Sequence, residues 1–294
     1  MRGSFELPGM RWVRASGTWD VLQRTASKVA LDHLSLLSAG VAFFLLLGLF
    51  PGLAGLIAIY GFLADAESVA SYFGGLSTLL PAEAAEVIQQ QAVDLARAGA
   101  GLGWGAFFGM LFALWAGAKA MRGVVAALNI AYSQDETRGF FYKQFVYLTL
   151  TLAVWVAGLF SLLLIALIPV VVNFLAIPAW LRAGLLWSRW PVLLVIGMTV
   201  IASIYRYGPA GVRPKWRFLS WGAGVATLLW LIASALFSLY VSNFANFDKT
   251  YGSLGAMVVL LMWLYITAFL LLIGAELDAQ IALRGKPESL AGGV

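Results

Sequence analysis

The chain has 294 residues, of which 62% are hydrophobic and 11% are charged, and its mean hydropathy is +0.88. Soluble globular proteins carry about 45–50% apolar and about 25% charged residues, so this composition excludes an ordinary water-soluble fold. The absence of cysteine excludes disulfides, thiolate catalysis and thiolate metal sites, and the net charge of +5 needs an explanation from where the cations lie.

The first segment, residues 1–33, is expected to lie in the cytoplasm. It contains no apolar stretch followed by a small-residue cleavage site, so no cleavable signal peptide is predicted. Within it, Trp19–His33 mixes apolar and charged residues and leads directly into the first long apolar stretch. This pattern predicts an amphipathic helix at the membrane interface.

Six stretches are long and apolar enough to span a bilayer, which takes about 20 residues of helix. They are Leu36–Leu63, Leu102–Ala126, Phe145–Val172, Val192–Tyr207, Phe218–Tyr240 and Leu254–Ile273. Runs such as Leu162–Val172 lack the apolar–polar alternation of membrane β-strands. The predicted fold is therefore an all-α, polytopic membrane bundle of six transmembrane helices.

The fourth of these spans is the weakest, because Arg189 and Arg206 bracket a short apolar stretch. An earlier start, near Trp187 and Trp190, is the alternative. The residues before it, Asn173–Trp190, are rich in tryptophan and are expected to form a loop in the interface.

The longest predicted loop is the outer segment 65–101, which holds five acidic residues. Pro81 suits the first position of a helix, and Glu83 and Glu86 would lie near the positive end of its dipole. An apolar stripe follows at helical spacing. The segment is predicted to form a helical cap over the outer mouth, with a docking site for a partner as the alternative.

The orientation follows from the lysines and arginines, which concentrate on the cytoplasmic side of membrane proteins. With both termini inside, 15 of the 19 cations are cytoplasmic, and the exceptions are Arg97, Arg182, Arg189 and Lys249. This bias predicts a cytoplasmic segment 1–33, a transmembrane domain 34–282 and a cytoplasmic tail 283–294. Topology and membrane lipids thus explain the basic charge, and no nucleic-acid partner is expected.

Pro51 interrupts the first span, where Gly48, Gly52 and Gly55 surround it. Proline removes a backbone donor and crowds the preceding turn, so a kink or break is expected. The glycines allow another helix to approach closely. The feature is interpreted either as a packing kink or as a hinge in a substrate path.

A polar cluster is predicted at the inner end of the second and sixth spans. Lys119, Arg122 and Asn129 share one face of the second span, and Glu276 lies at the same level in the sixth. We expect Glu276 to pair with Lys119 or Arg122, because a carboxylate at this depth needs a partner. Snorkelling of the two cations to the head groups is the alternative.

An outer gate is predicted in the last outer loop, from Asp248 together with Tyr251 and Gly252.

Catalytic chemistry finds little support in the sequence. The single histidine, His33, cannot form a metal-ligand set without cysteines, and Asp135 and Glu136 have no second cytoplasmic acidic cluster near them. No catalytic residue, metal or cofactor is predicted, and the chain is not expected to be an enzyme.

Three motifs resemble the YihY/BrkB family of inner-membrane proteins, once misnamed after a ribonuclease. The first is the run from Ser38 to Leu-Phe-Pro51, in which Gly48 stands where the family usually has serine. The second runs from Ala127 to Tyr132, with Glu-Thr-Arg at 136–138. The third comprises the segments 242–246, 251–256 and 274–277. The resemblance implies six spans in the bacterial inner membrane and links to envelope integrity, serum resistance and export of solutes or lipids.

The leading hypothesis is a transporter, exporter or lipid-translocating protein that supports the cell envelope. It would act on a small solute, an ion or a lipid. A scaffold for envelope assembly that transports nothing is the alternative, and a homo-oligomer is compatible with either. A large polar cavity would favour transport, whereas a dry bundle with every polar group paired would favour the scaffold.

Overall fold

The structure is a computed structural model that describes residues 18–61, 89–90, 103–174, 178–211, 220–244 and 255–284. Within these ranges its regular structure is entirely helical, in seven helices with defined bounds. Six of them are long and apolar enough to cross a membrane. The predicted all-α bundle of six spans is therefore confirmed.

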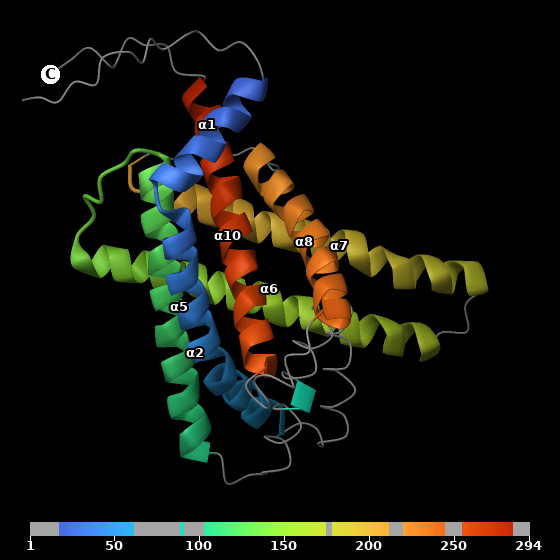
Figure 1. Ribbon diagram of the computed structural model, residues 1–294. Helices are drawn as coiled ribbons and strands as arrows, with labels where there is room; N and C mark the ends of the chain where they lie inside the picture. Colours follow the sequence, from blue (N-terminus) through green and yellow to red (C-terminus); the bar gives the residue numbers. More distant parts are fainter. Residues whose placement is uncertain are drawn as a thin grey trace, which may run out of the picture.

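The helices follow the chain in the order shown in Figure 1. They are α1 (Thr18–Leu31), α2 (Leu34–Gly61), α5 (Gly103–Ala131), α6 (Phe140–Phe174), α7 (Ala179–Tyr207), α8 (Trp221–Phe244) and α10 (Gly255–Arg284).

The start of the fourth span differs from its predicted limit. Helix α7 begins at Ala179, well before Val192, and α6 continues to Phe174, so the predicted loop Asn173–Trp190 is mostly helix. The charged residues that seemed to limit the span are accommodated inside it. Arg189, for example, places its guanidinium 5.3 Å from the ring centre of Trp190. A long cationic side chain can lie along an aromatic ring while its helix continues.

Among the described helices, α2 and α5 pack against each other most extensively, and small residues allow their close contact. A Cβ atom at Gly48 would lie 2.9 Å from the Cβ of Ala116, and one at Gly109 would lie 3.2 Å from the carbonyl oxygen of Pro51. Helix α2 continues through Pro51 without a break. The predicted close approach of another helix is thus confirmed, and α5 is that helix.

Helix α10 lies in the middle of the arrangement and packs against α1, α2, α5 and α8. Figure 1 shows α10 in red among these helices, while α6 and α7 run side by side across them. The main apolar core includes Val125 and Leu128 of α5 and Leu272 of α10. All three side chains are almost fully buried.

The residues of the candidate site lie at one end of the bundle, which we call the basic end. It is the end at which α5, α7 and α10 finish and α2, α6 and α8 begin. The predicted amphipathic segment forms α1 there, packed on α10. The outer cap, 65–101, falls almost entirely outside the described residues, and the orientation and domain limits remain predictions.

Candidate functional site at the basic end

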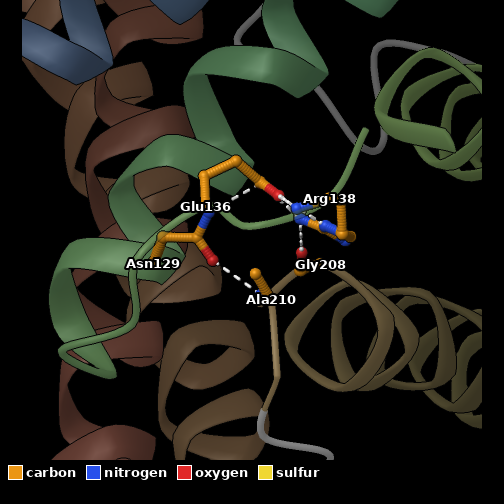
Figure 2. A network of polar contacts seen from close by, with 5 residues as sticks. All are labelled: Asn129, Glu136, Arg138, Gly208 and Ala210. Atoms are coloured by element: carbon orange, nitrogen blue, oxygen red, sulfur yellow. Dashed lines mark hydrogen bonds and ion pairs between the residues drawn. The ribbon is translucent and has the colours of Figure 1, made fainter. Parts of the chain in front are cut away.

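Asn129 lies in the last turns of α5 and joins two loops. Its side-chain oxygen accepts a hydrogen bond from the backbone N–H of Ala210, at 2.7 Å. Its amide nitrogen donates to Oε2 of Glu136, at 3.0 Å. The residue is 7% exposed, and its bond with Ala210 is buried, whereas its bond with Glu136 is partly buried. Figure 2 shows the side chain between the α5–α6 connection and the segment that follows α7.

Glu136 and Arg138 complete this network, which we call the Asn129 network. Nη2 of Arg138 lies 2.6 Å from Oε2 of Glu136, and Nε donates to Oε1 at 2.8 Å. The same Nη2 donates to the carbonyl oxygen of Gly208, at 2.9 Å (Figure 2). Two planar groups meet edge to edge here, which is the strongest geometry for an ion pair.

The electrostatics fix the charge of this pair. The hydrogen bonds from Arg138 lower the pKa of the Glu136 carboxyl from 4.5 to about 2, against a smaller opposing effect of burial. The hydrogen bond with Glu136 raises the pKa of Arg138 in turn. Glu136 is therefore ionised and neutralised by Arg138, and the pair ties the α5–α6 connection to the end of α7.

A pocket of about 440 Å³ opens beside the Asn129 network, between the end of α5 and the start of α6. It is lined by Arg122, Ala126, Asn129, Ile130, Gln134, Asp135, Glu136, Phe140, Lys143, Gln144 and Tyr147. With Glu136 neutralised, two cations, Arg122 and Lys143, face one remaining anion, Asp135. The first turn of α6 contains no acidic residue, so the positive end of its dipole adds to this field. The pocket combines a positive potential with an apolar wall.

The three residues that were predicted to share one face of α5 do not all line the pocket. Arg122 and Asn129 line the pocket. Lys119 does not line it and instead lies over the ring of Trp115, with Nζ 5.5 Å from the ring centre. The structure thus brings together two of the three predicted residues of this face.

A second junction at the basic end was missed by the sequence analysis. Asp278 of α10 accepts hydrogen bonds from the hydroxyl of Tyr132, at 3.3 Å, and from the backbone N–H of Gly222, at 3.1 Å. The hydroxyl of Ser220 caps the N-terminal end of α8 by accepting a hydrogen bond from the N–H of Ala223, at 3.0 Å. A carboxylate at the first turn of α8 satisfies a free amide and suits the helix dipole. Burial, followed by the charge of Asp278, raises the pKa of Tyr132.

The predicted pairing of Glu276 with Lys119 or Arg122 is wrong. Its side chain is fully buried, and Oε1 accepts a hydrogen bond from Nε2 of Gln280 at 2.7 Å. Its other oxygen, Oε2, is buried with no hydrogen-bond partner. The charges that act on it are those of Lys28 on α1 and of Asp32, which directly follows α1. Glu276 therefore bonds to neither cation of α5, since Lys119 lies over Trp115 and Arg122 lines the pocket.

The three residues of the predicted outer gate, Asp248, Tyr251 and Gly252, lie outside the described residues. Pro51 is described, and its carbonyl contacts Gly109 of α5 at the helix pair rather than a pocket at the basic end. Among the residues that the structure describes, no group of three or more His, Cys, Asp or Glu side chains could hold a metal ion.

The sequence of the chain is similar to those of a known protein family. The sequence profile of the family described as virulence factor BrkB matches residues 25–293. A ribonuclease-like protein of Bacillus subtilis, YfkH, is 31% identical over 281 residues, which covers 90% of this chain and 96% of that protein. The UPF0761 membrane protein IL2447 of Idiomarina loihiensis is 32% identical over 92 residues, 31% of this chain and 32% of its own length. A UPF0761 membrane protein of Tolumonas auensis is 31% identical over 119 residues, 38% of each chain.

No solved structure matches the chain. The match over nearly the whole sequence nevertheless agrees with the family that the three motifs indicated. The chain is an integral membrane protein that belongs to the BrkB family.

Proposed function

We propose that the protein moves an anionic, amphipathic substrate across the bacterial inner membrane, in support of the cell envelope. The observation that carries this proposal is the pocket at the basic end. Its lining combines Arg122 and Lys143 with the apolar side chains of Ala126, Ile130 and Phe140. A lipid-like anion has the same two-part character, with a charged head group and an apolar remainder.

Energetic reasoning supports a binding role for this pocket. Cations of the same sign on neighbouring helices repel each other, and an anion bound between them removes that repulsion. Glu136 is paired within the Asn129 network, but Arg122 and Lys143 lie on two different helices and converge on one pocket. Two cations and the start of α6 then act on the same volume, which suits an anion.

A scaffold without transport is the second candidate, and one observation favours it. The Asn129 network and the Asp278 junction are satisfied by hydrogen bonds within the protein, as a rigid support would require. No enzymatic activity is proposed for either candidate. The ribonuclease-like name of the Bacillus relative describes that protein, and this sequence has only one histidine and no cysteine.

Reconstitution into liposomes separates the two candidates. Flux of ions and osmolytes and scrambling of labelled anionic and zwitterionic lipids would be compared for the native chain, Arg122→Gln and Lys143→Gln. We expect movement of an anionic amphiphile that falls about tenfold in each variant, because each loses one charged contact of about 1.5 kcal/mol. Arg182→Gln, an exposed arginine at the far end of α7, serves as the matched control. Absence of any flux would establish the scaffold instead.

A further inference from the structure

Glu276 is the most unusual polar residue of the described bundle. It is fully buried, one carboxyl oxygen accepts from Gln280, and the other has no hydrogen-bond partner. A buried carboxylate with a free oxygen is unfavourable, because it has lost water and gained only part of the replacement. Its surroundings therefore call for one more positive partner.

Asp32, which directly follows α1, shows the same pattern. Its Oδ1 lies 3.7 Å from Nζ of Lys28, and its Oδ2 is buried with no hydrogen-bond partner. Asp32 is one of two residues that connect α1 to α2, and α1 packs against α10. Two carboxyl groups, each with one unsatisfied oxygen, thus belong to the region where α1 packs on α10, and the charge of Asp32 acts on Glu276.

The charge balance of this contact is incomplete. Lys28 is the one cation whose charge acts on Glu276, and its side chain is 42% exposed. The other helices packed on α10 add little, since α2 and α8 contain no Asp, Glu, Lys, Arg or His. Directly after α5, the neutral phenol of Tyr132 lies within electrostatic range of Glu276. Around Glu276 itself, two carboxyl groups therefore share one partly exposed ammonium, while Arg24 of α1 makes an interaction of its own.

We propose that Asp32 and Glu276 form a binding site for one monovalent cation, either a proton or an alkali-metal ion. Both use the same chemistry, because each is held by carboxylate oxygens and each removes the excess negative charge. A proton would bridge or neutralise one carboxyl group. A sodium ion would take the two free oxygens and complete its shell with further oxygens. The inference goes beyond the proposed function, since the site can be filled whether or not a substrate moves.

Filling the site has a structural consequence. When it is empty, two negative charges face each other across the α1–α10 contact and weaken it. When it is filled, the repulsion disappears and α1 stays packed on α10. Occupancy is thereby linked to the position of the segment that leads into α2, the helix most closely paired with α5.

The test uses infrared spectra of the full chain in nanodiscs of phosphatidylethanolamine and phosphatidylglycerol. In the proton arm, the carbonyl band of protonated carboxyl groups is followed during a pH titration. In the sodium arm, choline is exchanged for sodium at a fixed alkaline pH, and shifts of the carboxylate bands are recorded. A signal in either arm that Glu276→Gln abolishes supports the site and identifies its cation. Asp135→Asn, which removes an exposed carboxyl group, should leave that signal unchanged.

Two neighbouring variants keep the test decisive if Glu276→Gln fails to fold. Lys28→Gln removes the competing positive charge and should strengthen cation binding on the order of tenfold, whereas Asp32→Asn should weaken it by a similar factor. Opposite shifts support the shared site. Shifts in the same direction, no shift, or signals that are identical in the native chain and Glu276→Gln overturn it.

Discussion

The Asn129 network and the α1–α10 contact, both at the basic end, hold carboxyl groups in opposite ways. In the Asn129 network, both oxygens of Glu136 accept hydrogen bonds, and Arg138 also reaches the carbonyl of Gly208. In the α1–α10 contact, Glu276 and Asp32 each retain a buried oxygen without a partner. A complete network costs little to keep and fixes the positions of the parts that it joins.

An incomplete network has a different meaning. Its free oxygens lower stability unless a proton, a water molecule or an ion satisfies them, which is the basis of the cation site proposed above. The comparison therefore separates a joint that supports the bundle from a joint that responds to its surroundings. The following predictions test that separation.

The largest effect is expected from Arg138→Ala. The change leaves the Glu136 carboxylate without its ion pair and removes the bond to Gly208, so it should lower the free energy of unfolding by about 3 kcal/mol. Unfolding in mixed micelles with increasing denaturing detergent measures this loss. Arg182→Ala provides the control because Arg182 is exposed. Equal effects of the two variants would contradict a supporting role for the network.

The pH dependence of Glu136 should be next in size. Its pKa is about 2 in the folded chain and 4.5 without its partners. A lowered carboxyl pKa stabilises the fold above pH 4.5, and this contribution is lost as the pH falls from 4.5 toward 2. We expect a loss on the order of 2 kcal/mol across this window. Thermal unfolding at several pH values should show a flatter profile for Glu136→Gln, and an unchanged profile would refute the linkage.

A smaller loss is expected from Asn129→Ala. The variant leaves the buried N–H of Ala210 without an acceptor but keeps the ion pair between Glu136 and Arg138. One lost neutral bond with its desolvation should cost about 1 kcal/mol. Hydrogen exchange at Ala210, read by mass spectrometry of the 208–211 segment, should increase. Protection equal to that of the native chain would show that the amide finds another acceptor.

The smallest effect, and the sharpest contrast, is predicted for Glu276→Gln. The glutamine keeps a carbonyl oxygen for Gln280 and removes a buried charge, so stability at neutral pH in sodium-free buffer should stay within about 0.5 kcal/mol or increase. Removal of a charge would thus lower the free energy of unfolding in the Asn129 network but not in the α1–α10 contact. Thermal unfolding in the same buffer measures both, and a large loss for Glu276→Gln would erase the distinction.

Much of the fold could be predicted because its signal is local. Each span is a continuous apolar stretch, and length alone distinguishes it from a loop. The start of α7 was misjudged because charge was taken as a boundary, although Arg189 lies over the ring of Trp190 within the helix.

The site was harder to predict because its partners are distant in sequence. The bond from Tyr132 to Asp278 joins residues 146 positions apart, and Gly222 lies 56 positions from Asp278. Residues that are two positions apart on a helix point in directions about 200° apart, so Glu276 and Asp278 have different neighbours. The sequence singled out Glu276 as a carboxylate in need of a partner, but only the structure shows that its hydrogen bond comes from Gln280 on the same helix.

The central place of α10 also constrains how the protein is made. Helices α2 and α5 can pair as soon as both have emerged, because Gly48 and Gly109 supply the contact within the first half of the chain. The first turn of α8, in contrast, waits for Asp278, which the ribosome adds 56 residues after Gly222. A nascent chain without α10 therefore holds its earlier helices in the membrane with the amide of Gly222 and the hydroxyl of Tyr132 unsatisfied. The end of the bundle that Asp278 joins is therefore completed only when the last helix has been made.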